Sequence, residues 1–119
     1  ALISLDLEKT IQFYTEVVGM VLTNVITNRD EPTSTHIFFD MGGGNQLAFF
    51  DFPEKDKEPT VRGVGSMHHI ALKATADQFG ALLKTLDEKS IPYSLHGSRA
   101  QGSVYLRDPD NALIEVTCR

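Results

Sequence analysis

The stretch GSVYLRDPDNALIEVTC, residues 102–118, contains two strand patterns on either side of a turn. On both sides of the turn, apolar residues recur at every second position, which is the period of a half-buried β-strand. The letters between them, DPDN, combine the residues that favour a tight turn. The stretch therefore predicts a β-hairpin in which each strand buries one face.

A second hairpin of the same kind lies about 66 residues earlier in the chain. The stretch IFFDMGGGNQLAFF, residues 37–50, aligns with residues 103–116 when Asn45 is placed on Asn111. Few residues are identical, so the repeat depends on the shared order of turn and strand. Repetition of a whole unit indicates a fold built from two similar modules.

The elements that precede each hairpin repeat as well. Capping residues and helical periodicity predict two helices, and β-branched or apolar runs predict further strands. The expected strands are 1–5, 20–28, 35–41 and 46–52 around a helix at 6–19, then 67–74, 91–97, 102–107 and 112–118 around a helix at 75–90.

We therefore expect an α+β fold that forms a single domain over residues 1–119. Its two β-α-β-β-β modules would have curved mixed or antiparallel sheets that enclose one cavity for a metal or ligand. The expected boundaries are residues 1–52 for module one, 53–66 for a linker and 67–119 for module two.

Composition narrows the classes of function. The chain is 41% hydrophobic and 23% charged, as in ordinary soluble domains. Its net charge is −5 and it has no run of Lys or Arg, so no nucleic-acid partner is expected. The single cysteine, Cys118, cannot form an internal disulfide. No apolar run is long enough to span a membrane and no secretory signal is present, which predicts a cytoplasmic protein with no membrane partner.

Strand alternation places several polar side chains on one face of the second module. His69, Glu115 and Tyr105 share the parity opposite to the apolar core residues, whereas His68 has the helix-facing parity. A carboxylate within an apolar strand is costly to bury unless it is paired or coordinated. These three residues therefore indicate a polar site on a concave face. His36, which lies in another predicted strand, is interpreted as structural.

Three stretches resemble the vicinal oxygen chelate superfamily, which includes glyoxalase I, bleomycin- and fosfomycin-resistance proteins and extradiol dioxygenases. They are DLEKTIQFYTEVVGM (6–20), HHIALK (68–73) and YLRDPDNALIEV (105–116). The resemblance implies two modules whose curved sheets enclose one metal site. It also implies a homodimer.

The resemblance implies His69 and Glu115 as metal ligands, and it places the family's other His ligand before Ala1. The glyoxalase branch uses a further carboxylate at a place that the alignment gives to Phe49, which cannot bind a metal. A set of two His and one carboxylate suits Fe(II), with Mn(II), Zn(II) and Ni(II) as alternatives.

Two further residues receive roles from the same resemblance. Tyr105 would hydrogen-bond the bound oxygen of a substrate, and His96 would transfer a proton. Apolar residues with the parity expected for the cavity face would form its wall: Phe39, Phe49 and Leu113.

The expected function is a metal-dependent, dioxygenase-like reaction on a small catechol-like molecule chelated through vicinal oxygens. Three alternatives stay open. The first is a glyoxalase-type lyase or isomerase. The second is a fosfomycin-resistance thiol transferase, for which Arg99 and Arg107 are candidate anion ligands. The third is a metal-free protein that sequesters a ligand, like bleomycin-resistance proteins.

Overall fold

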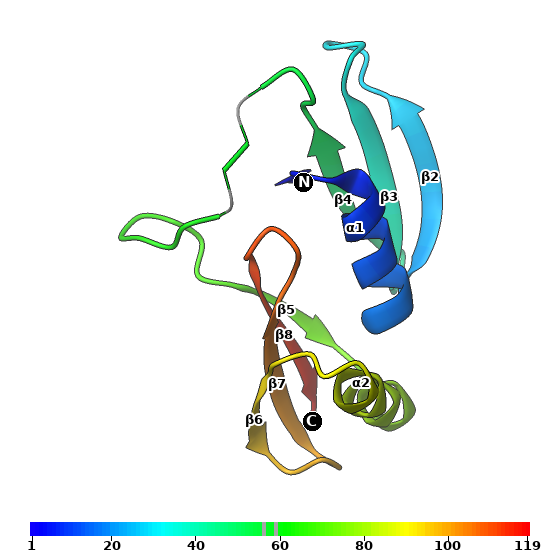
Figure 1. Cartoon of the computed structure of the whole chain (residues 1–119). Coiled ribbons are helices and arrows are strands. Elements are labelled where there is room, and N and C mark those ends of the chain that lie inside the picture. The colour runs from blue at the N-terminus through cyan, green and yellow to red at the C-terminus, as the bar shows by residue number, and fades with distance from the viewer. Residues whose placement is uncertain (56, 59) are drawn as a thin grey trace. The chain divides into compact units, whose positions relative to one another are not determined.

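The computed structural model describes residues 1–55, 57–58 and 60–119 (Figure 1). The chain divides into two compact units, residues 1–59 and 60–119. The elements of unit one are β1 (Leu2–Ser4), α1 (Leu7–Gln12), the π-helical segment η1 (Phe13–Val17), β2 (Val21–Thr27), β3 (Thr35–Gly42) and β4 (Asn45–Asp51). The elements of unit two are β5 (Ile70–Lys73), α2 (Ala76–Glu88), β6 (Ser94–Gly97), β7 (Gly102–Arg107) and β8 (Leu113–Cys118).

Both units have the same sheet topology. The strand order is β1-β4-β3-β2 in the first sheet, called sheet A, and β5-β8-β7-β6 in the second, called sheet B. In each sheet the first strand pairs in parallel with the last, and the other pairs are antiparallel. The predicted α+β fold with two repeated β-α-β-β-β units is confirmed. β6 lies at a sheet edge, as Pro92 just before it requires.

The first helix begins as predicted but differs in its interior and at its C-terminal end. The carboxylate of Asp6 accepts a backbone N–H of the first turn, so it is the N-cap. Sequence periodicity predicts one continuous helix over 6–19, whereas the structure changes to a π-helical segment at Phe13–Val17. The segment ends at Val17 with Val18 as its C-cap, and the next residue, Gly19, has a φ of +88° that is readily adopted only by glycine.

The second helix begins with a capping box. The hydroxyl of Thr75 accepts the backbone N–H of Gln78, and the Gln78 side chain accepts the backbone N–H of Thr75. This reciprocal pair satisfies two donors that a helix start leaves unpaired. Thr75, the first residue of the helix predicted over 75–90, is therefore the N-cap of α2.

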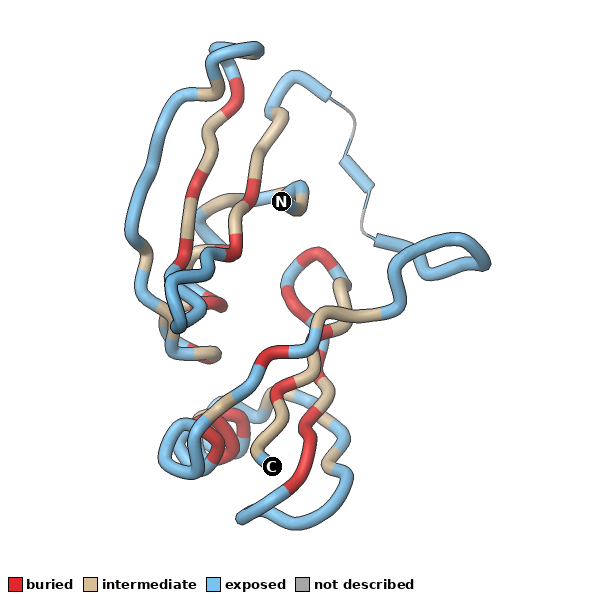
Figure 2. The backbone as a smooth tube through the Cα atoms, turned by 180° about the vertical axis from the view of Figure 1, so that it is seen from behind, coloured by how far each residue is buried: buried red, intermediate tan, exposed pale blue. Residues whose placement is uncertain are grey.

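Aromatic packing fills the core of unit one. Tyr14 from η1 is fully buried against Phe39 and Phe49, at ring-centroid distances of 5.6 and 5.0 Å. Buried and less buried positions alternate along β3 and β4 (Figure 2). The prediction that Phe39 and Phe49 line the cavity face is therefore wrong, because both rings lie in the core under the helix.

The cause is a shift of one residue in the alignment of the two hairpins. Ala48 pairs with Phe38 in sheet A as Glu115 pairs with Tyr105 in sheet B, which gives an offset of 67 residues. The alignment at the turns placed Phe49 on Glu115. Because side chains alternate, a shift of one residue moves every side chain to the opposite face.

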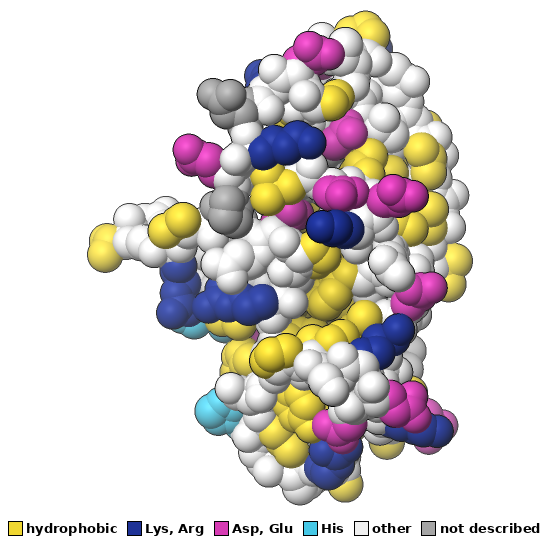
Figure 3. Space-filling model, in the orientation of Figure 1, with side chains coloured by type: hydrophobic (Ala, Val, Ile, Leu, Met, Phe, Trp, Pro, Cys, Tyr) yellow, Lys and Arg dark blue, Asp and Glu magenta, His cyan; other side chains and the backbone are white. Residues whose placement is uncertain are grey.

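One face of the molecule carries charged side chains of both signs. Basic and acidic groups are interspersed on the face shown in Figure 3. None of the helices in the described residues is both long and apolar enough to cross a membrane.

Two glycines in unit two are expected to respond to alanine with opposite signs. A Cβ at Gly102 would lie 2.3 Å from the carbonyl oxygen of His96, so Gly102→Ala forces the β6–β7 hairpin apart. We expect it to lower the free energy of unfolding by about 2–3 kcal/mol. At Gly80, inside α2, a Cβ meets nothing within 4 Å. Gly80→Ala should therefore raise the same quantity by about 0.5–1 kcal/mol. Urea unfolding measures both, and changes of the same sign would contradict this account.

Candidate functional site

The open face of sheet B, on the side away from the buried core, carries the residues predicted to form the site. In the strand register, Glu115 of β8 lies between Ala71 of β5 and Tyr105 of β7, and Ser94 of β6 continues the row. On β7 and β8 the neighbouring positions are buried on the other face. The alternation read from the sequence therefore places Glu115 and Tyr105 side by side.

His69 immediately precedes β5, and its ring contacts Glu115. The Nε2 atom of His69 lies 2.9 Å from Oε1 of Glu115. The side chains keep 28% and 15% of their accessible surface, so the pair is partly shielded from water. The two residues implied as ligands are therefore brought together.

The geometry and chemistry of this pair fit a divalent cation. Adjacent donors that each bind one octahedral cation at about 2.1 Å are about 3 Å apart, close to the spacing seen here. An imidazole nitrogen with a carboxylate oxygen is a donor set that suits Fe, Mn and Zn. Within the described residues no group of three or more His, Cys, Asp and Glu side chains converges. The pair is thus a candidate for two of the ligands of such an ion.

The two other predicted residues lie along the same face. The ring of Tyr105 is 5.8 Å from that of His69 and 5.2 Å from that of His96, both nearly perpendicular. His96 is on the edge strand β6, opposite Ser103, and is exposed. The four residues named from the sequence thus form one continuous group.

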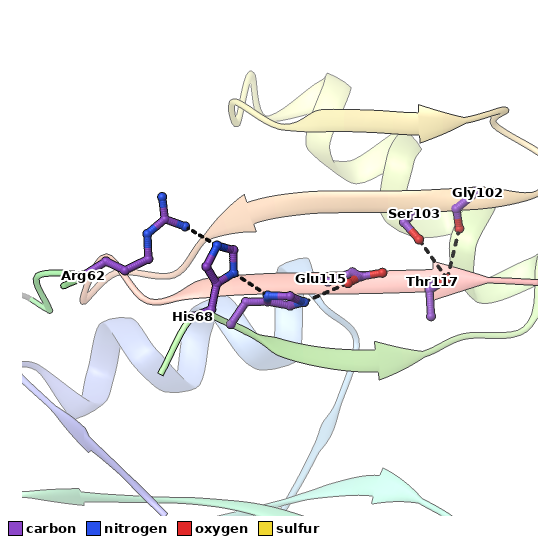
Figure 4. A network of polar contacts seen from close by, with 7 residues as sticks. Arg62, His68, Gly102, Ser103, Glu115 and Thr117 are labelled. Atoms are coloured by element: carbon purple, nitrogen blue, oxygen red, sulfur yellow. Dashed lines mark hydrogen bonds and ion pairs between the residues drawn. The ribbon is translucent and has the colours of Figure 1, made fainter. Parts of the chain in front are cut away.

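A chain of hydrogen bonds extends from this group toward the segment before β5 (Figure 4). Nη1 of Arg62 lies 2.9 Å from Nε2 of His68, and Nδ1 of His68 lies 2.7 Å from Nδ1 of His69. The chain ends at Glu115.

The donor at one end of this series of hydrogen bonds, Arg62, and the acceptor at the other end, Glu115, determine which nitrogen of each histidine carries a proton. A guanidinium can only donate, so Nε2 of His68 accepts from Arg62 and Nδ1 of His68 carries the proton. His69 then accepts at Nδ1 and donates from Nε2 to Glu115, since an ionised carboxylate only accepts. A metal bound at Nε2 of His69 would take the place of that proton.

His68 and Arg62 are the residues that sequence reasoning missed. The prediction treated His68 as part of a strand from residue 67, with its side chain toward the helix. The strand begins only at Ile70, so alternation does not apply to His68, and its ring contacts that of His69. The HH pair itself was the signal for His68, whereas Arg62 lies in a stretch with no periodic pattern.

The surroundings of Glu115 favour its ionised form. Burial by itself would raise the pKa of this carboxyl, but hydrogen bonds from Ser103, Tyr105 and His69 outweigh it and hold the pKa below the usual 4.5. Glu115 is therefore a carboxylate near neutral pH, which is the form that binds cations.

The repeated topology and the His–Glu pair agree with the resemblance noted in the sequence. A family model described as Glyoxalase/Bleomycin resistance protein/Dioxygenase superfamily matches residues 1–116. The chain belongs to this superfamily. The match covers both units, so membership does not depend on one motif.

One curated member of the superfamily is similar in sequence. It is the "Putative ring-cleaving dioxygenase MhqA" of Bacillus subtilis (strain 168), 34% identical over 71 residues. The aligned part is 57% of this chain and 22% of the relative. The chain thus spans about a fifth of the length of that relative.

Solved structures of superfamily members show the same fold. A glyoxylase/bleomycin resistance protein/dioxygenase domain from Frankia sp. EAN1pec has a TM-score of 0.81 at 14% identity, covering 98% of this chain and 91% of its own. A Bacillus subtilis putative dioxygenase has a TM-score of 0.76 at 23% identity, covering 100% of this chain and 38% of its own. The fosfomycin resistance protein FosX from Listeria monocytogenes, complexed with Mn(II), has a TM-score of 0.70 at 19% identity, covering 98% and 87%. At these identities the likeness concerns the fold.

Proposed function

We propose that this superfamily member is a metal-dependent, ring-cleaving dioxygenase-type enzyme for a small aromatic substrate with two vicinal oxygens. The 2.9 Å contact between His69 and Glu115, on an open face next to Tyr105, is the observation that carries the proposal. The similarity to the Bacillus subtilis protein named "Putative ring-cleaving dioxygenase MhqA" supports the reaction class.

His69 and Glu115 would hold the metal, with Fe(II) as the first choice and Mn(II), Zn(II) and Ni(II) as alternatives. Fe(II) held by these residues would supply Lewis-acid chemistry that lowers the pKa of substrate hydroxyls, and a site for O₂. The protein's part is to hold the substrate in one orientation, which by itself removes much of the barrier.

Tyr105 would position the substrate through its hydroxyl. Burial, together with the neighbouring Glu115 carboxylate, raises the pKa of Tyr105, so its phenol keeps the proton at neutral pH. The hydroxyl donates to Glu115 in the structure, and it would turn to the substrate once that carboxylate held a metal. The His96 ring, 5.2 Å from that of Tyr105, is exposed enough to exchange a proton with solvent. We assign His96 the transfer of that proton to or from the substrate.

A glyoxalase-type reaction is less well supported because its extra carboxylate ligand has no counterpart. The strand register puts Ala48 at the place that corresponds to Glu115. The methyl group of Ala48 cannot bind a metal. The absence of a fourth ligand, which the sequence alignment attributed to Phe49, therefore holds for Ala48.

A fosfomycin-type reaction lacks support at the two arginines named for it. Nη2 of Arg99 lies 2.8 Å from Oδ2 of Asp87, and its Nη1 donates to the hydroxyl of Tyr93. Nη1 of Arg107 donates to the carbonyl oxygen of Asn111. Both guanidinium groups therefore have partners outside the His69–Glu115 pair.

Oxygen uptake with a panel of catechols tests the proposal, on protein expressed from its natural gene and loaded with Fe(II) without air. We expect Tyr105→Phe to lower kcat about 10- to 100-fold at saturating metal, because it removes a donor to the substrate. The same hydroxyl supports Glu115, so the affinity for Mn(II) should also fall, but by less than in a variant that removes the Glu115 carboxylate itself.

The matched control is Tyr93→Phe, whose hydroxyl donates to Asp87 at 2.7 Å and is not part of the group. It should leave kcat unchanged. Absence of oxygen uptake with every catechol would overturn the proposal, and phosphonate-dependent consumption of a thiol would replace it with the fosfomycin-type reaction.

A further inference from the structure

The open face of sheet A carries a row of side chains with one imidazole among apolar groups. The strand register aligns Ile3 of β1, Phe50 of β4, His36 of β3 and Ile26 of β2 across all four strands. We call these four residues the His36 row. Ile3 and Ile26 are 63% and 43% exposed, so both ends of the row are accessible.

Aromatic rings surround the imidazole. The His36 ring stacks on Phe50 with a centroid distance of 3.7 Å and an interplanar angle of 19°. Phe38, two residues along the same strand and face, lies at 4.2 Å with a tilt of 42°. Phe52 extends the stack beyond Phe50, at 6.1 Å and 23°. The His36 row, together with Phe38 and Phe52 beside it, therefore offers flat apolar surface on which an aromatic ring can stack.

The Nε2 atom of His36 is buried and has no hydrogen-bond partner among the described residues. Buried polar atoms are almost always paired, so an atom without a partner calls for an explanation. Burial lowers the pKa of His36, which keeps the ring neutral. A neutral imidazole nitrogen can form one hydrogen bond with a hydroxyl, as donor or as acceptor.

We propose that the His36 row binds a hydroxylated aromatic ring, which stacks on the aromatic side chains while its hydroxyl hydrogen-bonds to Nε2 of His36. The phenolic nature of the ligand rests on the proposed function, whereas the stacking surface and the unpaired nitrogen belong to sheet A alone. Since Nε2 is covered, neighbouring side chains have to shift as the ligand enters.

The test uses two probes of the same shape on chelator-treated protein, so that no metal can hold the hydroxyl. These are 2-naphthol and 2-methylnaphthalene, each titrated by its own fluorescence. We expect 2-naphthol to bind about tenfold more tightly, as one added hydrogen bond allows. In long-range ¹⁵N spectra of the histidine rings, Nε2 of His36 should shift with 2-naphthol and not with the methyl compound.

His36→Leu should remove the preference by weakening 2-naphthol binding to the level of 2-methylnaphthalene. His36→Gln keeps a polar group near the position of Nε2 and should restore part of the preference for 2-naphthol. Phe52→Leu is the matched control, because it removes aromatic surface without a polar atom and should weaken both probes equally.

Stability separates this role from a structural one. Removing an unpaired buried nitrogen should leave the urea midpoint of His36→Leu unchanged or raise it. A lower midpoint together with an unchanged preference would overturn the proposal. Equal binding of the two probes, no binding of either, or binding without a shift of His36 would overturn it as well.

Failure of the proposed function would give a different result. Lack of oxygen uptake, with the 2-naphthol preference intact and sensitive to His36→Leu, removes the dioxygenase reaction and leaves the His36 row in place. Oxygen uptake without that preference removes the His36 row and leaves the reaction in place.

Discussion

Glu115→Gln is expected to weaken Mn(II) binding by about 100-fold or more, since even loss of a residue that only supports a ligand commonly reduces metal affinity 10- to 100-fold. The carboxamide has nearly the shape of the carboxylate but no charge to offer a cation. Its amide can still contact His69, whose Nε2 lies 2.9 Å from the Glu115 carboxylate. Calorimetric titration with Mn(II), on protein expressed from its natural gene, measures the change.

The control for this variant is Glu88→Gln in the same unit. Glu88 is a carboxylate of α2 that lies 3.9 Å from Lys84 and is mostly exposed. Its loss removes the same charge from the protein without touching the candidate site, so Mn(II) affinity should stay within about twofold. An equal loss of Mn(II) affinity in both variants would show that only net charge matters, and it would refute His69 and Glu115 as metal ligands. Absence of Mn(II) binding in the unmodified protein would instead favour a metal-free protein that sequesters its ligand.

The parities of sheet B were predictable because its strands alternate cleanly between apolar and polar residues. Ile114 and Val116 are buried while Glu115 between them is on the open face, as the alternation requires. Tyr105 is likewise on the open face, because its two neighbours along the strand, Val104 and Leu106, are buried. Wherever one face of a strand is buried, the register leaves few alternatives for the other face.

The register of sheet A relative to sheet B was not predictable from the turns, because the two hairpins turn differently. In sheet A the pair Gly42–Asn45 closes a two-residue loop, next to a register shift after Asp40. In sheet B the last pair is Arg107–Leu113, which leaves a longer loop. Loop length and bulges set the register of a hairpin, so aligning the two turns at Asn misplaces the strands by one residue.

The part of the site that precedes β5 could not be derived from the sequence for a different reason. Alternation applies only inside a strand, and the strand begins at Ile70. The positions of Arg62 and His68 depend on hydrogen bonds between side chains, for which a single sequence has no periodic signal. Sequence reasoning therefore identified the residues on the sheet and not those that contact them from the loop.

Phe49→Ala is expected to lower the free energy of unfolding by about 3–5 kcal/mol. The Phe49 ring is fully buried, 5.0 Å from Tyr14 and 5.8 Å from Phe39, so its removal leaves a cavity in the core under the helix. The milder Phe49→Leu keeps much of the volume and should lower the same quantity by about 1–1.5 kcal/mol. Urea unfolding followed by circular dichroism measures both.

The neighbouring residue is the matched control, because one step along β4 reaches the opposite face of the sheet. Phe50 is only partly buried and stacks on His36, so Phe50→Ala should lower the free energy of unfolding by about 1 kcal/mol. Had the alignment at the turns been right, Phe49 would occupy the place of Glu115 on the open face, and the order of the two effects would be reversed. A larger loss for Phe50→Ala than for Phe49→Ala would therefore contradict the register from which Ala48 is matched with Glu115. The stability of these two variants thus tests the same one-residue shift on which the argument against a fourth ligand depends.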